Sequence, residues 1–203
     1  MTTIGFIRHG ITEWNILGRA QGTSDIPLNK EGRRQASLMG ERLLNEADWD
    51  VMIASDLSRA IETAGIIGNK INMPIHHYET RIREINCGEI EGTTEEARLM
   101  RWGSNWRNLD LGMERFEDVG ERGKEVAEEL VQLYNGKRIL IVSHGALIGL
   151  TLKALLPAAF ERTYIDNASM TILRQSEGGW KCELYNCTEH LTRNTSTSVI
   201  QQN

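Results

Sequence analysis

Short apolar runs that alternate with amphipathic segments are the feature that most constrains the fold of this chain. The runs at residues 3–7, 51–54 and 138–143 are each long enough for one buried strand. Between them, apolar residues recur at helical spacing in three sets: Ala36, Gly40, Leu43 and Ala47; Ala60, Ala64, Ile67 and Ile71; Val119, Gly123, Val126, Leu130 and Leu133. Because strands that alternate with helices form a mainly parallel sheet covered on both faces, the pattern predicts an α/β fold, a three-layer α/β/α sandwich.

Residues that cap or break helices predict the remaining boundaries. Asn29 is a candidate cap of the first helix, Gly136 is expected to end the third, and Pro157 is expected to stop an apolar helix at 146–156. We expect a short strand around 74–78, and two strands at 170–174 and 180–185 that are joined by a turn at 177–179. We expect a single domain over residues 1–203, with a lid or insertion around 86–116 and a loose tail after residue 191.

Composition excludes several classes of function. The chain has 203 residues and a formal net charge of −5, which gives no basic field for nucleic acid. The longest aliphatic run, at residues 139–142, is far too short to span a membrane, and the first residues do not resemble a signal peptide. Three cysteines without a C-x-x-C pattern indicate reduced thiols and a cytoplasmic location. The oligomeric state is not indicated.

Three polar clusters follow predicted strands, at the edge where ligands bind in sheets of this type. They lie at residues 8–10, 55–59 and 143–145. His9 and His144 are 135 positions apart, yet each follows an apolar strand and precedes a glycine. If these two strands pair side by side in parallel, both imidazoles lie at one rim of the sheet.

These residue types suit phosphoryl transfer. A neutral imidazole can attack phosphorus and carry the phosphoryl group as a covalent intermediate. Arg8 and Arg59 supply charged forks for phosphate oxygens, and His144, if protonated, would add a third donor. Because the arginines neutralise the phosphate, no metal or other cofactor is required. A leaving alkoxide also needs a proton donor, and the candidates are Glu84, Glu89 and Glu91.

Several blocks of the chain resemble the motifs of the histidine phosphatase superfamily, also called the phosphoglycerate mutase-like family. Residues 8–15 resemble its R-H-G-E-T-x-W-N signature, and residues 55–64 resemble its S-D-L-x-R-A-x-x-T-A block. The other matching blocks are R-x-Q-G-x-x-D-x-P-L at 19–28, G-x-x-Q-A at 32–36, L-x-E-x-x-x-G-x-W-E-G at 83–92, S-H-G at 143–145 and N-A-S at 167–169. The resemblance runs from residue 4 to about residue 174, and it implies the phosphoglycerate mutase-like fold.

The resemblance implies a role at each matching position. His9 would be the nucleophile that forms phosphohistidine, and Glu84 would protonate the leaving group and then activate water. The residues that would complete the phosphate pocket are Arg8, Arg59 and His144. The residues that would line the pocket and touch substrate or phosphate are Asn15, Gln21, Gly22 and Gly145.

Some positions depart from the family pattern or receive a structural reading. Ile11 replaces the usual glutamate after R-H-G, which leaves open the polar support beneath the pocket. Ile82 stands in for leucine and Ile90 for tryptophan, and none of these changes removes a catalytic group. Glu91 falls where the family uses a structural glutamate, and we expect Cys87 to be a small apolar residue rather than a redox centre.

The segment after residue 91 favours hydrolysis over phosphoryl return. Mutases of this family are usually longer and carry an inserted E-R-H-Y-G segment, which this sequence lacks. We therefore expect a metal-independent phosphomonoester hydrolase of the histidine acid type, acting on a small phosphorylated metabolite. A 2,3-bisphosphoglycerate-dependent phosphoglycerate mutase is the alternative. Candidate substrates are alpha-ribazole phosphate, sugar phosphates and phosphoglycerates.

Two other classes of protein remain for comparison. An inactive module that binds phosphorylated ligands would lack one of the five catalytic residues, and all five are present. A metal-dependent hydrolase built on His76 and His77 has no supporting ligand spacing.

In the expected lid, two tryptophans either stack on a substrate ring or pack in the core, and four arginines either bind a second anionic group or are solvated. These residues are Trp102, Trp106, Arg98, Arg101, Arg107 and Arg115.

Overall fold

A six-stranded sheet forms the centre of the molecule. The computed structural model describes residues 1–192. The tail that the sequence predicts to be loose falls, from residue 193 on, outside the described residues. The strands are β1 (Thr2–Arg8), β2 (Val51–Ala54), β3 (His77–Tyr78), β4 (Arg138–Ser143), β5 (Met170–Ser176) and β6 (Gly179–Cys187). They lie in the order β3-β2-β4-β1-β5-β6; β1 to β4 run parallel, and β5 runs antiparallel to both β1 and β6.

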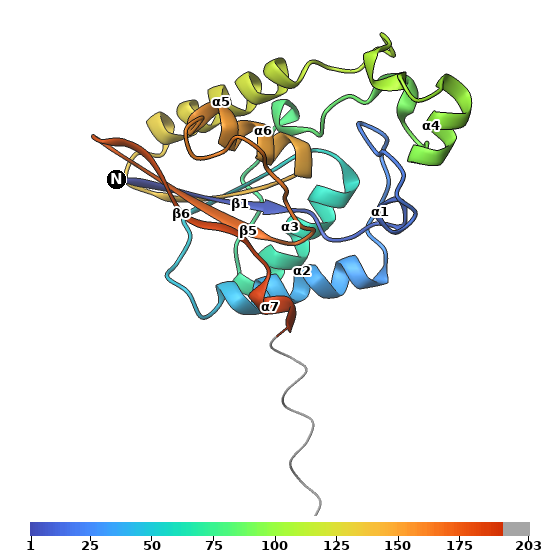
Figure 1. The fold of residues 1–203 in the computed structure, drawn as a ribbon. Helices are drawn as coiled ribbons and strands as arrows, with labels where there is room; N and C mark the ends of the chain where they lie inside the picture. Colours follow the sequence, from blue (N-terminus) through green and yellow to red (C-terminus); the bar gives the residue numbers. More distant parts are fainter. Residues whose placement is uncertain (193–203) are drawn as a thin grey trace, which may run out of the picture.

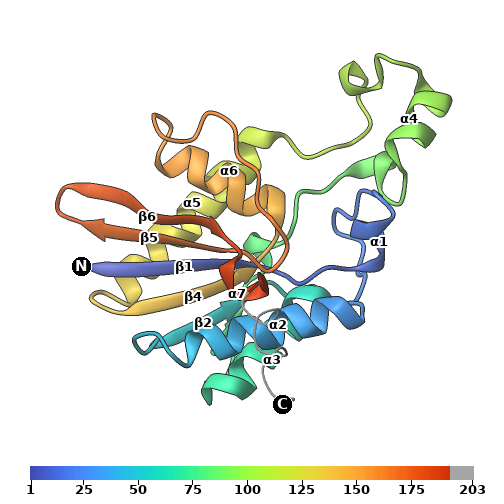
Figure 2. The same cartoon turned by 60° about the horizontal axis from the view of Figure 1, so that its bottom comes forward.

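Helices cover both faces of this sheet, as Figures 1 and 2 show. On one face lie α2 (Lys30–Leu43) and α3 (Ser58–Ile71), and on the other lie α5 (Phe116–Leu133) and α6 (Gly145–Leu155). The short helices α1 (Glu13–Ile16) and α4 (Glu95–Trp102) lie near each other at one end, and α7 (Glu189–Thr192) follows β6. Single 3-10 turns occupy Thr80–Ile82, Gly88–Ile90 and Trp106–Asn108. The predicted three-layer α/β/α sandwich is confirmed.

The central strands supply two separate cores because side chains alternate across a sheet. In β4, Ile139 and Ile141 pack beneath α5 and α6, whereas Leu140 and Val142 pack against α2 and α3. Strand β1 divides in the same way. Strands buried on both faces have continuous apolar runs, and this is why the sequence shows them so clearly.

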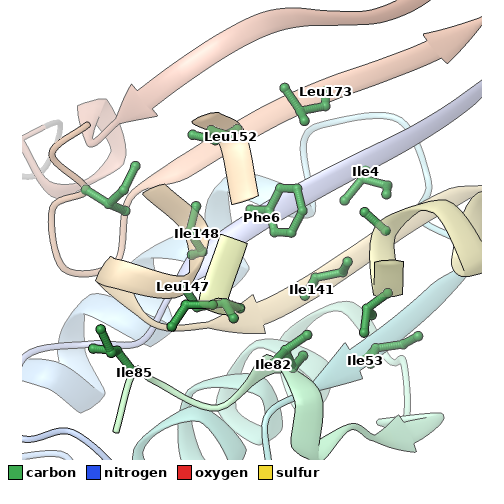
Figure 3. Packing of buried hydrophobic residues seen from close by; sticks show 14 of the residues in the cluster. Ile4, Phe6, Ile53, Ile82, Ile85, Ile141, Leu147, Ile148, Leu152 and Leu173 are labelled. Carbon is green, nitrogen blue, oxygen red and sulfur yellow. The ribbon is translucent and has the colours of Figure 1, made fainter. Parts of the chain in front are cut away.

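The larger core also fixes the segment that carries Glu84. Ile82 and Ile85 are buried in the same cluster as Leu147 and Ile148 of α6 (Figure 3). The Ser143 hydroxyl at the end of β4 donates a hydrogen bond of 2.8 Å to the Ile82 carbonyl. Residues 82–85 are therefore held against the end of β4.

Most predicted boundaries hold to within a few residues. Asn29 caps α2 as predicted, accepting a hydrogen bond of 2.9 Å from the Gly32 N–H. The inclusion of Ala47 in that helix was wrong, because α2 ends at Leu43 and Ala47 is exposed. The strand expected around 74–78 is reduced to two residues, since Pro74 has no N–H to pair at this sheet edge. No helix among the described residues has the length and apolar character needed to cross a membrane.

Candidate active site

Parallel pairing of β1 and β4 brings His9 and His144 together. Arg8 lies opposite Ser143 in this pairing, so the residue after each strand is a histidine. The His9 N–H donates to the Ser143 carbonyl at 2.9 Å. The two buried rings lie 5.2 Å apart between centroids, at an angle of 58°. The shared rim expected from the sequence is therefore present, and we call the paired ends of β1 and β4 the rim.

One hydrogen bond fixes the tautomer of His9. Its Nδ1 lies 2.7 Å from the Gly10 carbonyl oxygen, which can only accept, so Nδ1 carries the hydrogen. Nε2 keeps its lone pair and has no hydrogen-bond partner among residues 1–192. Burial, together with the charges of Arg8 and Arg59, lowers the pKa of His9 well below its ordinary value. The ring is therefore neutral at pH 7, the state in which Nε2 can attack phosphorus.

A late loop holds the backbone of His9. The His9 carbonyl accepts hydrogen bonds of 3.1 Å from the Ala168 N–H and from Nδ2 of Asn167. Ala168 has a φ of 53°, a left-handed conformation that few non-glycine residues adopt. The N-A-S block was noted in the sequence without a role, and here it supports the end of β1.

Ser55 fixes the second imidazole. Its Oγ lies 2.8 Å from Nε2 of His144 and accepts a hydrogen bond of 3.4 Å from the Leu57 N–H. When the Ser55 hydroxyl donates its hydrogen to Nε2, the hydrogen of the neutral His144 ring lies on Nδ1. Burial, then the charges of Arg59 and His9, lower the pKa of His144 well below its ordinary value.

In this tautomer, Nδ1 of His144 carries the N–H that can donate a hydrogen bond. It is buried and makes no hydrogen bond within the described part of the chain. Buried polar groups are almost always paired, so an N–H beside His9 with no protein acceptor is suited to bind an anion. The neutral ring of His144 can therefore donate to a phosphate oxygen without being protonated.

Two buried guanidinium groups have orphaned N–H groups of the same kind. Arg59 is fully buried and donates to the Ser24 and Gly22 carbonyls, both at 2.8 Å, while Arg8 donates to the Ile165 carbonyl at 2.5 Å. Nε of each arginine is buried without a partner among residues 1–192. Burial lowers the pKa of both groups, and the nearby carboxylate of Glu84 opposes this effect. The arrangement suits an anion with several oxygens.

Glu91 supports the loop that orients Arg59. One carboxylate oxygen accepts from the Thr23 N–H at 2.9 Å, and the other accepts from the Ser24 N–H at 3.0 Å and the Ser24 hydroxyl at 2.5 Å. Gly22 in this loop has a φ of 51°, and a Cβ there would lie 2.0 Å from Oε1 of Glu91. The structural role expected for Glu91 agrees with these contacts, and Gly22 acts through its carbonyl on Arg59.

Glu84 lies at the start of α6, on the other side of the site. Its carboxylate accepts from the backbone N–H groups of Ala146 at 3.3 Å, Leu147 at 3.1 Å and Ile85 at 3.0 Å. Arg8 and Glu84 both line one hollow of about 340 Å³, together with Gly145. A side chain at Gly145 would place its Cβ 3.2 Å from Nε of Arg8. The absence of a side chain there leaves the Arg8 guanidinium accessible.

Thr12 orients two predicted pocket residues. It donates to Oε1 of Gln21 at 2.9 Å through its hydroxyl and to Oδ1 of Asn15 at 3.1 Å through its N–H. Both amide oxygens are thus occupied, and the side-chain N–H groups are left for an acceptor. At Ile11, where the family has glutamate, the backbone N–H donates to Oε1 of Gln35 at 2.9 Å.

The arginines of residues 86–116 are engaged within the protein. Arg107 forms an ion pair of 2.9 Å with Glu95, and Arg98 donates to the Thr93 carbonyl at 2.7 Å. Arg101 and Arg115 lie 3.5 and 3.9 Å from glutamates. Trp106 is buried, which supports the core alternative for this residue, and Trp102 is half-buried against the core. Burial raises the pKa of the Cys87 thiol to about 12, in agreement with an inert, small apolar residue.

No cluster of three or more histidine, cysteine, aspartate or glutamate side chains in residues 1–192 is arranged to hold a metal. Of the two histidines weighed as ligands, His76 instead accepts a hydrogen bond of 3.2 Å from the Met52 N–H through Nδ1. His77 is exposed in the edge strand β3.

Comparisons with known proteins agree in fold and in family. The profile described as Histidine phosphatase superfamily (branch 1) matches residues 4–188. The chain is 34% identical over 194 residues to Uncharacterized phosphatase PhoE of Bacillus subtilis, covering 95% of this chain and 98% of PhoE. It is 33% identical over 208 residues to Probable phosphoglycerate mutase GpmB of Yersinia pestis, covering 94% and 95%. A phosphoserine phosphatase mutant of Entamoeba histolytica, solved in complex with phosphoserine, matches with a TM-score of 0.80 and 27% identity over 94% and 100% of the two chains.

Proposed function

Because this chain belongs to the histidine phosphatase superfamily, we propose that it hydrolyses phosphomonoesters of small metabolites through a phosphohistidine formed at His9. The family resemblance predicted from the sequence blocks is confirmed, and the phosphatase relatives support an enzyme that acts on phosphate esters. The observation that carries the mechanism is the buried, neutral His9 ring, whose Nδ1–H is bound to Gly10 and whose Nε2 is free.

The first step transfers the phosphoryl group to the protein. Nε2 of His9 attacks phosphorus and the bond from phosphorus to the ester oxygen breaks, while Arg8, Arg59 and Nδ1–H of His144 hold the other phosphate oxygens. Glu84 gives its proton to the departing oxygen, so the product leaves as an alcohol. As the new bond forms, the Gly10 carbonyl stabilises the positive charge on the His9 ring.

The second step returns His9 to its resting state. The Glu84 carboxylate takes a proton from water, the resulting hydroxide attacks phosphorus, and the P–N bond breaks to release inorganic phosphate. Both steps use charges that the chain itself supplies, which supports a metal-independent enzyme of the histidine acid type. The three free cysteines support our proposal of a cytoplasmic location.

The decisive experiment separates hydrolysis from transfer. The protein is incubated with 3-phosphoglycerate, with and without 2,3-bisphosphoglycerate, while 2-phosphoglycerate and free phosphate are followed; p-nitrophenyl phosphate is run beside it, with and without a chelator. We expect phosphate release that survives chelation, little 2-phosphoglycerate, and an acid-labile phosphoprotein that His9→Ala lacks.

A mutase is the second candidate, favoured by the similarity to the probable mutase GpmB. Fast isomerisation stimulated by 2,3-bisphosphoglycerate would establish it and refute our proposal of hydrolysis. Binding of phosphate esters without any turnover would instead indicate an inactive binding module.

A further inference from the structure

Two hollows lie on either side of Glu84, and their linings differ. The first, which we call the apolar hollow, has walls formed largely by Phe116, Leu150, Tyr164 and Ile165, with Arg8 at its edge. The second, which we call the polar hollow, has a volume of about 440 Å³ and is lined by groups such as Asn86, Glu114 and Arg122. Glu84 lines both hollows, so the alcohol part of a substrate could extend into either one.

The positions of the phosphate-binding groups select between them. A phosphomonoester must reach an arginine with its phosphate and Glu84 with its ester oxygen. The apolar hollow contains both Arg8 and Glu84. The polar hollow contains Glu84 but not Arg8, and a third hollow, beside Asn15, contains Arg8 but not Glu84. Arg59 lines none of the three, so Arg8 and Glu84 are the residues that distinguish them. The alcohol part of the substrate therefore extends into the apolar hollow.

Exposed apolar side chains form the mouth of this hollow. The exposed fraction is 58% for Phe116 and 71% for Tyr164, and Leu150 is half-buried. Phe116 is the first residue of α5 and Tyr164 lies in the loop between α6 and β5, so neither is needed in the core. An apolar ligand would remove these surfaces from water, which is favourable in proportion to the area covered.

Charge in the apolar hollow points the same way. Among the described residues, Arg8 is the only cation that lines this hollow, and it pairs with the phosphate group of the substrate. On the other side of Glu84, Arg83 forms an ion pair with Asp56, and Arg122 pairs with Glu114 at 2.8 Å. A carboxylate on the alcohol part of a substrate would lie against aromatic walls with no lining cation left to pair with it, which costs free energy.

We propose that the preferred substrates are phosphomonoesters of neutral alcohols that carry an apolar or aromatic group, and that carboxylate-bearing esters such as phosphoserine and phosphoglycerates are disfavoured. This inference rests on the proposed hydrolysis at His9. It assigns Phe116, Leu150 and Tyr164 to the recognition of the alcohol part.

A matched pair of substrates tests the charge preference. 4-(Methoxycarbonyl)benzyl phosphate and 4-carboxybenzyl phosphate have nearly the same size and the same kind of leaving group, a benzylic oxygen that a methylene separates from the ring. We expect kcat/KM to be at least about tenfold higher for the neutral compound. Equal values, or a preference for the carboxylate, would overturn the inference.

Variants of Phe116 locate the effect. Phe116→Ala should lower kcat/KM for the neutral benzyl ester by roughly tenfold and lower it much less for methyl phosphate, which has no apolar group to contact the ring. Phe116→Lys should narrow or reverse the preference by supplying a cation. Leu133→Ala, at a solvent-facing position at the far end of the same helix (72% exposed), is the control. It should change neither the preference for the neutral over the carboxylate ester nor the preference for the benzyl ester over methyl phosphate. If the Phe116→Lys protein keeps the wild-type preference for the neutral ester, the alcohol part does not bind in the apolar hollow and the inference is wrong.

The same assays distinguish the two levels of failure. If p-nitrophenyl phosphate and both benzyl esters are inert and no phosphoprotein forms, the proposed function itself fails. If all three are hydrolysed through a phosphoprotein but charge and Phe116 have no influence, the hydrolase stands and only the proposed substrate class is wrong.

Discussion

The rim and the segment at residues 86–116 face the same site but are held in different ways. At the rim, both imidazoles are buried and each is fixed by a short hydrogen bond to the protein. In the segment, Arg101 and Arg107 are exposed and attach through surface ion pairs. Exposed ion pairs add little to stability, whereas a buried polar group that loses its partner is costly. We infer that substitutions at the rim lower the rate of the reaction strongly, whereas substitutions in the segment change activity and stability only slightly.

The largest effect that would test this contrast is expected at the nucleophile. His9→Ala removes the only group proposed to attack phosphorus, so kcat for p-nitrophenyl phosphate should fall by roughly three orders of magnitude or more. Stopped assays with purified protein, and circular dichroism to verify folding, provide the measurement. Near-wild-type turnover would remove the phosphohistidine from the mechanism.

Next in size is the proton donor, whose effect should depend on the substrate. Glu84→Gln should slow alkyl phosphates by roughly 10² and p-nitrophenyl phosphate by much less, since nitrophenolate leaves without a proton. Glu89→Gln, at an exposed position paired with Arg101, is the matched control. Equal losses on both substrates would point to another acid.

A smaller effect is expected for the hydroxyl that sets the His144 tautomer. Ser55→Ala should reduce kcat/KM by roughly tenfold, because the ring can then place its hydrogen on Nε2, away from the phosphate. Nitrogen-15 NMR of the histidine rings reports this directly: the Nδ1–H tautomer in the wild type and a mixture in the variant. Ser55→Thr retains a hydroxyl and should restore the signal. An Nε2–H tautomer in the wild type would contradict our assignment.

The buried rings also predict how stability depends on pH. The pKa values of His9 and His144 are lowered in the folded protein. Below about pH 6.5, the unfolded chain therefore binds protons at these two histidines that the native state does not bind. The free energy of unfolding should therefore be constant above that pH and fall below it, by at most about 1.4 kcal/mol per pH unit for each histidine. Urea titrations at pH 7.5 and 5.5 measure it. His144→Gln should flatten the slope, whereas exposed His77→Asn should not.

The smallest effect is expected in the segment itself. Glu95→Gln weakens contacts to the exposed Arg107 and to Nε1 of the buried Trp106, although a glutamine oxygen can still accept from both. We expect kcat/KM to remain within roughly twofold of wild type and the melting temperature to change little. A tenfold loss of activity would erase the contrast between the two regions and assign the segment a part in catalysis.

The same contrast explains which features could be predicted from sequence. The strands that end at Arg8 and Ser143 are recognisable because each is buried on both faces, and their neighbouring motifs follow from that placement. The contact of Ser55 with His144 was missed although its motif was noted, because a hydroxyl that acts through another side chain has no pattern of its own. Phe116 and Tyr164 meet only in the folded chain, so no local periodicity relates them.

The pairing of β1 with β4 also sets when the enzyme can become active during its synthesis. His9, the proposed nucleophile, is among the first residues made, but His144 follows it by 135 residues. Contacts so distant in sequence form late, since a long loop must close first. A nascent or truncated chain that ends before β4 therefore carries His9 without its neighbouring imidazole, and phosphate esters in the cell meet a competent site only once the second half of the protein has been made.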